Sequence, residues 1–233
     1  MEDELEQKVQ TMEKELEELE DKLEKERIVS TDGTLTWRID NVSQVMADAQ
    51  SERKTSILSA PFYSSPTGYK MAARLYLNGD GSGKRTHVSL FFVLMKGEFD
   101  ALLPWPFNHK VTFTLLTQLN TGTNHHDSFR PDIKSNSFQR PVTEMNVASG
   151  IPKFLQLPLL MQDGNPYIVN DTMFVRVIVD MIEIPKQVQT VLLNLNPGLP
   201  RAARQKAIDD EIRKLQESEL DQTPITQNSS MES

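Results

Sequence analysis

The sequence predicts an all-β antiparallel sandwich preceded by an α-helical coiled coil. Within residues 29–185, short apolar and β-branched runs recur between Gly, Pro, Asn and Asp clusters, and no long helical pattern separates them. Residues 1–28 contain no Gly, Pro or aromatic residue and carry an apolar heptad pattern. Residues 186–233 also lack aromatic residues. Only the middle of the 233-residue chain therefore has the material for a packed core.

The first predicted domain, residues 1–28, is an oligomerisation helix. Its apolar residues are spaced alternately by four and by three, as the a and d positions of a heptad are. A lone helix of this length is marginal in water, so the apolar seam needs partner helices. The seam and its flanking charges leave the number of chains open, and a solvated single helix is the alternative. The seam residues are Leu5, Val9, Met12, Leu16, Leu19 and Leu23.

The second predicted domain, residues 29–185, is the sandwich. Its clearest strand candidates are 35–40, 57–64, 69–78, 87–96, 110–119 and 172–184, with weaker ones at 127–130 and 136–140. Alternation within 69–78 places on one face Met71, Ala73, Leu75 and Leu77. The other face then carries Lys70, Ala72, Arg74 and Tyr76. The segment NGDGSG at 78–83 supplies the turn to the next strand.

The remaining residues, 186–233, form a C-terminal extension. Residues 201–220 have the pattern of an amphipathic helix, with Ala207, Ile208, Ile212 and Leu215 on one side. The polar residues after them are typical of disorder.

Composition excludes several classes of function. The net charge is −8, and the acidic excess lies mainly in the N-terminal arm, so the chain has no basic footprint for nucleic acid. The absence of cysteine excludes disulfides, thiolate zinc sites and a cysteine nucleophile. No apolar run reaches the length of a membrane span, and the charged first residues do not form a signal peptide. We expect a soluble, cytoplasmic protein without direct membrane insertion.

One cluster raises the possibility of catalysis. His125, His126 and Asp127 are consecutive in a polar stretch, but they lack the spacing of a metal site, and the pattern favours a solvated loop. No nucleophile motif and no carboxylate pair accompanies them. A hydrolase that uses the His125–Asp127 loop is therefore the weakest alternative, and we expect no enzyme activity, metal or cofactor.

Two groups of residues favour binding. Arg74 and Tyr76 lie two apart on the polar face of their strand, where a guanidinium and a phenol together can receive a carboxylate. The segment SNSFQRP at 135–141 offers hydroxyls and an amide that suit an extended peptide. Pattern alone favours plainer interpretations, namely a surface ion pair for Arg74 and a locally capped loop for 135–141.

Four strings, YLNGDGSG, WPFN, FRPD and SFQRP, occur in that order. With GTLTWRI at 33–39 and FVRVIVDMIEI at 174–184, they closely resemble the TRAF-C, or MATH, domain of the tumour necrosis factor receptor-associated factors. The branch of factors one, two, three and five is the most similar. The likeness covers nearly all of residues 29–185, and the heptads before it are similar to the family's coiled coil.

This resemblance implies an eight-stranded sandwich that trimerises in parallel through the coiled coil. Each subunit is expected to bind the motif (Pro/Ser/Ala/Thr)-x-(Gln/Glu)-Glu as a strand added to a sheet edge. The implied partners are cytoplasmic tails of clustered receptors of the tumour necrosis factor receptor type, together with other signalling adaptors. The chain would be recruited to the membrane through those receptors.

The resemblance also implies a role for particular residues. Arg74 and Tyr76 match positions that hold the acidic side chain of the peptide, and Asp80 matches a polar contact near them. The positions that grip the Gln or Glu correspond to Ser135, Asn136 and Ser137. The shallow pocket for the upstream residue corresponds to Phe91, Phe113, Phe129, Phe138, Ser149 and Gly150.

The chain departs from the family pattern at three places. Asn136 interrupts a serine run, Phe113 replaces a smaller aliphatic residue, and the extension after residue 185 has no family role. The RING and zinc-finger modules of most members are missing, so this chain alone is expected to lack ubiquitin-ligase activity. The leading alternative function is a MATH-type module that presents substrates to a ubiquitin ligase or deubiquitinase.

Overall fold

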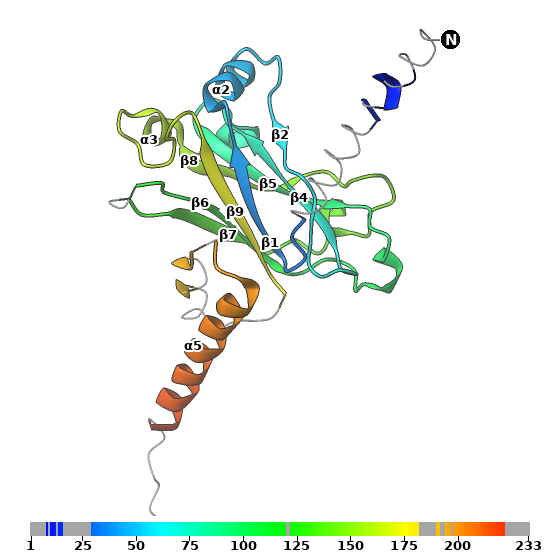
Figure 1. The fold of residues 1–233 in the computed structure, drawn as a ribbon, viewed down its shortest axis with the longest axis vertical. Helices are drawn as coiled ribbons and strands as arrows, with labels where there is room; N and C mark the ends of the chain where they lie inside the picture. The colour runs from blue at the N-terminus through cyan, green and yellow to red at the C-terminus, as the bar shows by residue number, and fades with distance from the viewer. Residues whose placement is uncertain are drawn as a thin grey trace, which may run out of the picture. The chain divides into compact units, whose positions relative to one another are not determined.

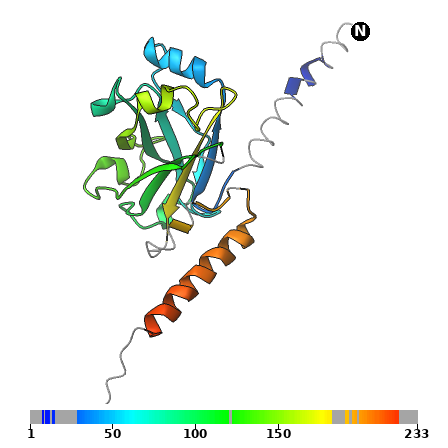
Figure 2. The ribbon, with the colours of Figure 1, turned by 90° about the vertical axis from the view of Figure 1, so that its left-hand side faces the viewer.

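The computed structural model describes residues 8, 10–12, 14–15, 29–119, 122–181, 190–191, 194–196 and 198–221. In this part of the chain, two antiparallel sheets pack face to face (Figures 1 and 2). Sheet A has the order β1-β9-β6-β7, and sheet B has the order β2-β4-β5-β8, with β3 also paired to β4. The predicted antiparallel sandwich is therefore confirmed.

The strands follow most of the predicted ranges. Sheet A consists of β1 (Thr34–Ile39), β6 (Lys110–Leu115), β7 (His125–Phe129) and β9 (Met173–Asp180). Sheet B consists of β2 (Ile57–Leu58), β3 (Phe62–Tyr63), β4 (Lys70–Tyr76), β5 (His87–Met95) and β8 (Ser149–Gln156). Short 3-10 turns lie at η1 (Gly81–Gly83), η2 (Asp100–Leu102) and η3 (Asn136–Phe138).

Strands β2 and β3 are two pieces of one edge strand. Leu58 pairs with Arg74 and Phe62 with Met71, so four steps along this edge match three steps along β4. Pro61 lies between the pieces, and because proline has no N–H it interrupts the ladder there. Counted as one interrupted strand, the pair gives the eight strands that the resemblance implies.

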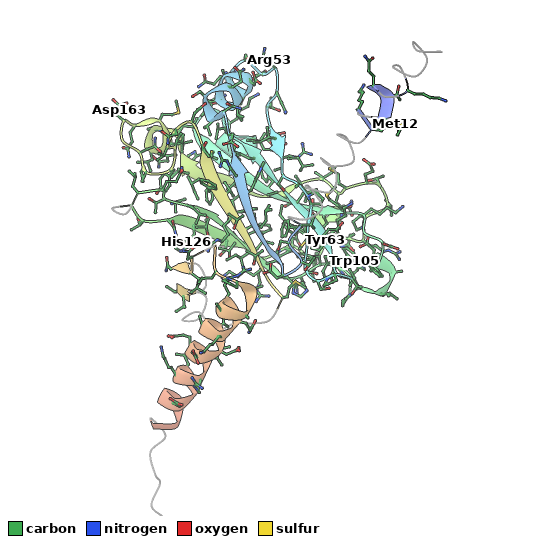
Figure 3. All side chains as sticks on the ribbon, in the orientation of Figure 1. Met12, Arg53, Tyr63, Trp105, His126 and Asp163 are labelled. Atoms are coloured by element: carbon green, nitrogen blue, oxygen red, sulfur yellow. The ribbon has the colours of Figure 1, made fainter. Side chains whose placement is uncertain are left out.

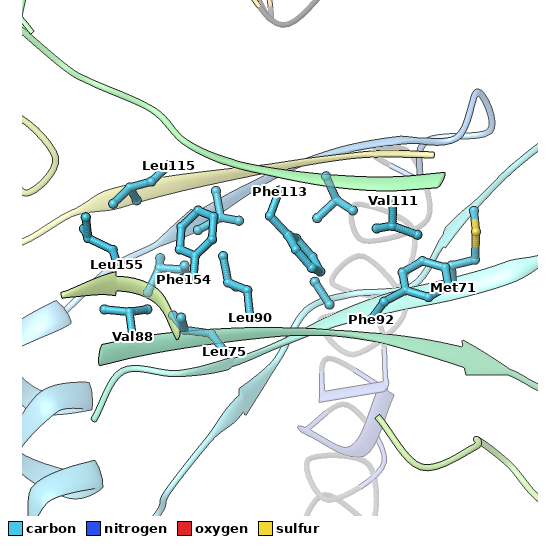
Figure 4. Close-up of a cluster of buried hydrophobic side chains, with 14 of the residues drawn as sticks. Met71, Leu75, Val88, Leu90, Phe92, Val111, Phe113, Leu115, Phe154 and Leu155 are labelled. Carbon is cyan, nitrogen blue, oxygen red and sulfur yellow. The ribbon is translucent and has the colours of Figure 1, made fainter. Parts of the chain in front are cut away.

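The core lies between the sheets and is fully apolar at its centre (Figure 4). Side chains with no more than 1% exposure come from both sheets, among them Met71, Leu75, Leu90, Phe92, Val111, Phe113 and Leu115. Burial of each large apolar side chain stabilises the fold by about 1.5–3 kcal/mol, because it removes apolar surface from water. The alternation predicted for residues 69–78 is confirmed, since Met71, Ala73, Leu75 and Leu77 all face this core.

Helix α2 (Val42–Gln50) was not predicted from the sequence. It buries Val42, Met46 and Ala49, which lie on one side of the helix, against the sandwich. Its first turn is capped by a distant residue, because the backbone N–H of Ser43 donates to the Asp171 carboxylate over 2.8 Å. A cap supplied from 128 residues away leaves no local signal in the sequence.

Two further predictions were wrong or incomplete. The expected strand at 136–140 is absent, and residues Asn136–Phe138 form a 3-10 turn in which the Ser135 hydroxyl accepts from the Ser137 N–H. Strand β8 was missed because Gly150 and Pro152 interrupt its apolar pattern. An edge strand tolerates proline, since only one side of it needs ladder donors. Helix α3 (Leu157–Met161) follows β8 directly.

The chain divides into two compact units, Met1–Met181 and Ile182–Ser233. The second unit contains helix α5 (Arg201–Asp221), coloured orange to red in Figure 1, over the range in which the sequence predicts a helix. None of the helices in the described ranges is long and apolar enough to cross a membrane.

The predicted coiled coil falls mostly outside the described residues. Leu5, Val9, Leu16, Leu19 and Leu23 lie outside them, whereas Met12 belongs to the described helical residues (Figure 3). The Met12 side chain is 67% exposed in the single chain. The oligomerisation helix therefore stays a prediction.

His109 gives the fold a testable dependence on pH. Its ring lies against the rings of Phe107 and Tyr69, and burial lowers the pKa of His109 below 6.5. The folded state therefore binds fewer protons than the unfolded state, so this contribution to stability is present above pH 6.5 and is lost as the pH falls. Between pH 7.5 and 5.5, we expect the thermal midpoint to fall less for His109→Gln than for the wild type. Calorimetry with His126→Gln, an exposed control, checks this, and equal pH slopes for both variants would contradict it.

Candidate functional site

The free edge of sheet B is the central feature of the candidate site. Strand β8 pairs with β5 on one side, and none of the described strands pairs with its other side. Such an edge presents unpaired N–H and C=O groups to an incoming extended chain. A β-carbon at Gly150 would lie 2.5 Å from the Leu90 carbonyl oxygen, so glycine allows β8 to lie close to β5 at this point.

One row of residues crosses sheet B toward this edge. Arg74 on β4 is opposite Phe91 on β5, and Phe91 is opposite Gly150 on β8. Directly opposite residues of antiparallel strands project to the same face, so Arg74 and Phe91 lie together on the outer face. The neighbouring Tyr76 ring meets the Phe91 ring edge to face, with centroids 5.4 Å apart. The structure thus brings Arg74 and Tyr76 on β4 together with Phe91 on β5, the strand next to β8.

The Arg74 guanidinium is held only by neutral groups. Its Nη1 donates to the Ser56 hydroxyl over 3.3 Å, and its Nη2 lies 3.7 Å from the Met145 sulfur. Among the described residues, no carboxylate pairs with Arg74, so the plainer interpretation of a surface ion pair is not supported. Both hydrogen bonds are weak compared with a guanidinium–carboxylate fork. Arg74 is therefore open to a better anionic partner.

Asp80 occupies the turn after β4, as the sequence predicts. Its backbone N–H donates to the Ser89 hydroxyl over 2.9 Å, and that hydroxyl donates to the Pro152 carbonyl oxygen over 2.6 Å. Ser89 therefore links the turn to edge strand β8 at the point where the β5–β8 register shifts. A β-carbon at Gly83 would lie 1.8 Å from the Pro152 oxygen, which explains the need for glycine in this turn.

Residues 135–141, called here the hydroxyl segment, lie between β7 and β8 and are locally capped. Asn136 is exposed, whereas Ser135 and Ser137 are half-buried. The Asn146 side-chain amide donates to the carbonyl oxygens of Ser137 and Gln139, at 3.1 and 2.7 Å. Asn146 thereby fixes the segment to the chain that leads into β8.

The six pocket residues that the resemblance implies differ in accessibility. Phe91, Phe129, Ser149 and Gly150 are half-buried, whereas Phe113 and Phe138 are 0% and 2% exposed. Phe113 stacks on Phe129 with centroids 6.3 Å apart, and Phe138 lies 6.1 Å from Phe129. Phe113 and Phe138 are therefore buried against Phe129 in the free chain, and their role in a peptide pocket stays a prediction.

The expected solvated loop at His125–Asp127 is wrong, because these residues lie on β7. His125 is half-buried against the Phe154 ring, and its Nε2 lies 2.7 Å from the Phe154 carbonyl oxygen. His126 projects to the opposite face and is exposed (Figure 3). No group of three potential metal ligands occurs in the described ranges. The role that the structure gives His125 is packing.

Sequence reasoning missed Ser56, Met145, Asn146 and Ser89. Met145 and Asn146 belong to an irregular segment, and Ser56 precedes a strand of only two residues, so no periodic pattern singled them out. Their positions depend on which strands become neighbours.

Asn146→Ala tests the anchoring of the hydroxyl segment. Loss of both amide hydrogen bonds leaves two carbonyl groups without this donor, and we expect a destabilisation of about 1–3 kcal/mol. Chemical denaturation measures this loss. Asn108→Ala, an exposed asparagine substitution, is the matched control and should change stability by less than about 0.5 kcal/mol. Equal effects of the two substitutions would show that Asn146 does not anchor the segment.

The geometry agrees with the comparisons to known proteins. The sequence model of the TRAF/meprin MATH domain family matches residues 54–176. TNF receptor-associated factor 1 of Mus musculus is 50% identical over 177 residues, which cover 76% of this chain and 43% of that protein. TNF receptor-associated factor 2 of Homo sapiens is 48% identical over 164 residues, covering 70% and 32%.

A solved structure is also similar to this chain. TRAF5 of Notothenia coriiceps superposes with a TM-score of 0.69 at 41% identity, covering 76% of this chain and 87% of that one. These matches, with the observed strand order, define the class as an antiparallel MATH sandwich. The chain belongs to the TRAF family. It spans less than half the length of the curated relatives described above.

Proposed function

We propose that this chain is a trimeric cytoplasmic adaptor that binds receptor tails through short acidic motifs. The observation that carries the proposal is Arg74, an arginine that pairs with no carboxylate among the described residues and lies on β4, separated from the open edge strand β8 by β5 alone. The relatives are named as factors associated with the TNF receptor, which supports tails of that receptor type as partners.

The binding mode follows from the edge. The main chain of a (Pro/Ser/Ala/Thr)-x-(Gln/Glu)-Glu segment pairs with β8 as an added strand. Its final Glu reaches Arg74 and Tyr76, with Asp80 as a polar contact nearby. Its Gln or Glu meets Ser135, Asn136 and Ser137, and its first residue rests on Phe91 and Phe129.

Affinity for one peptide is expected to be weak, because an extended segment loses conformational entropy when it binds. Three linked sites on a coiled-coil trimer raise the effective concentration to about the millimolar range. Clustered receptors would then be captured through avidity, and the adaptor would in turn recruit other signalling adaptors.

A direct comparison of peptide classes tests this function. Fluorescence anisotropy is measured with a Pro-x-Gln-Glu peptide, with the same peptide carrying Gln in place of Glu, and with a Ser/Thr-rich peptide lacking Glu. We expect measurable binding of the first and at least fivefold weaker binding of the second. Preference for the Ser/Thr-rich peptide would instead assign the chain to substrate presentation in the ubiquitin system.

A further inference from the structure

Ser56 lies next to the proposed carboxylate receptor. Its hydroxyl accepts from Arg74 Nη1 over 3.3 Å. Ile57 pairs with Leu75 and Leu58 with Arg74, so continuing this register by one residue places Ser56 opposite Tyr76. Opposite residues share a face, so Ser56, Arg74 and Tyr76 lie together on the outer face of sheet B.

The residues before Ser56 have the charge pattern of a kinase substrate. Arg53 and Lys54 precede Ser56 by three and two residues, and the segment 51–55 is exposed. Arg53 lies in the turn after α2, where its side chain is 67% exposed and pairs with Asp48 (Figure 3). Kinases discriminate substrates by such charge patterns, because acidic groups around the catalytic cleft attract basic residues before the acceptor. The half-buried Ser56 is followed by a two-residue edge strand, so a small displacement of this segment frees the hydroxyl.

We propose that Ser56 is a phosphorylation site for an arginine-directed protein kinase, and that its phosphate occupies Arg74 and excludes acidic peptides. The exclusion of peptides rests on the proposed function, whereas the phosphorylation and the contact with Arg74 do not.

The covalent step uses ATP as the phosphoryl donor. The Ser56 hydroxyl oxygen attacks the γ-phosphorus, and a new oxygen–phosphorus bond forms. The bond from the γ-phosphorus to the β–γ bridging oxygen breaks, and ADP leaves with that electron pair. The hydroxyl proton passes to the catalytic aspartate of the kinase.

The product places a strong anion beside Arg74. A phosphoserine carries a charge of about −1.5 to −2 at pH 7 and offers three acceptor oxygens. Guanidinium binds phosphate in the same forked geometry with which it binds a carboxylate. Since the Ser56 hydroxyl already contacts Arg74, the phosphate needs no rearrangement of the sheet to reach it. The tethered phosphate then competes with the Glu of a peptide at a high effective concentration.

Peptide binding provides the first test. The full chain is prepared with phosphoserine encoded at position 56 and, as a matched control, with phosphoserine encoded at position 51, an exposed serine at the start of the same segment. Anisotropy with a Pro-x-Gln-Glu peptide should show at least tenfold weaker binding for the phosphate at 56 and no change for the phosphate at 51. Unchanged affinity with the phosphate at 56 would overturn the exclusion of peptides.

Phosphorus NMR provides a test without any peptide. Contact with Arg74 stabilises the dianion, so the second pKa of phosphoserine, ordinarily about 6, should be lower at position 56 than at 51. Arg74→Ala should return it to the value at 51. If Arg74→Ala leaves it unchanged, the contact is refuted. If the contact is present but the unmodified chain binds no acidic peptide, the proposed function fails and the phosphate–arginine pair stands.

Kinase treatment tests the site itself. The full chain is incubated with an arginine-directed kinase and Mg-ATP, and the modified residue is located by mass spectrometry. Phosphate should appear on Ser56, at least tenfold more slowly in Arg53→Ala and at unchanged rate in Thr55→Ala. Absence of phosphate on Ser56, under conditions in which a peptide of residues 50–60 is modified, would overturn the site.

Discussion

Leu16→Asp or Leu19→Asp is expected to abolish tight capture of trivalent ligands while leaving single-peptide affinity unchanged. Both residues belong to the predicted apolar seam, and a carboxylate placed between packed helices loses its hydration without gaining a partner. The chains should therefore separate into monomers. The sandwich, which has its own core, should remain folded.

The expected size of this effect follows from avidity. Linked sites strengthen overall binding by about 10²–10⁴-fold over a single site, and a monomer loses all of that gain. Light scattering measures the mass of each variant, and a surface carrying a trivalent Pro-x-Gln-Glu ligand measures capture. Anisotropy with the monovalent peptide shows whether the individual site is intact.

Lys14→Asp is the matched control for the seam. Lys14 is exposed and lies between the seam positions, so the same carboxylate there should leave both mass and capture nearly unchanged. Equal capture of the trivalent ligand by Leu16→Asp and the wild type would refute the avidity mechanism. A wild-type chain that stays monomeric at all concentrations would refute the trimer.

Arg74→Ala is expected to weaken binding of a Pro-x-Gln-Glu peptide by about 1–3 kcal/mol, the cost of leaving the desolvated carboxylate without its hydrogen-bond donor. Among the described residues, the Arg74 guanidinium donates to the Ser56 hydroxyl and the Met145 sulfur and pairs with no carboxylate, so little is lost when it turns to a carboxylate. Isothermal titration calorimetry measures the change.

A double-mutant cycle assigns this loss to the acidic residue of the peptide. Arg74→Ala should strongly weaken binding of the Glu peptide but hardly change binding of the corresponding Gln peptide, because the Gln peptide has no carboxylate for Arg74 to bind. Arg38→Ala is the control, because Arg38 is a surface arginine of sheet A that pairs with Asp40. An unchanged affinity for Arg74→Ala would remove Arg74 from the site.

Part of the candidate site was predictable because it depends on local alternation. The period of two along residues 69–78 places Arg74 and Tyr76 on the face away from the core, and the structure confirms that assignment. Ala72 shows where alternation is insufficient. It shares the outer face, yet it is 0% exposed.

The aromatic residues show a second limit. The resemblance groups Phe113 and Phe138 with Phe91 and Phe129 around one pocket. In the structure Phe113 and Phe138 both pack against Phe129, but Phe113 and Phe138 are buried in the core, whereas Phe91 and Phe129 are half-buried. Accessibility is a property of the packed molecule, and no sequence motif encodes it.

The sequence by itself determined the sandwich class, the ranges of six strands, the turn at Asp80 and the face of Arg74. All of these depend on residues close together in the chain, through side-chain alternation and turn chemistry. Tertiary structure alone decided the cap of α2 by Asp171, the edge strand β8 and the meeting of Ser56 with Arg74. These features join residues distant in sequence, and only the pairing of strands and the exclusion of water from the core bring them into contact.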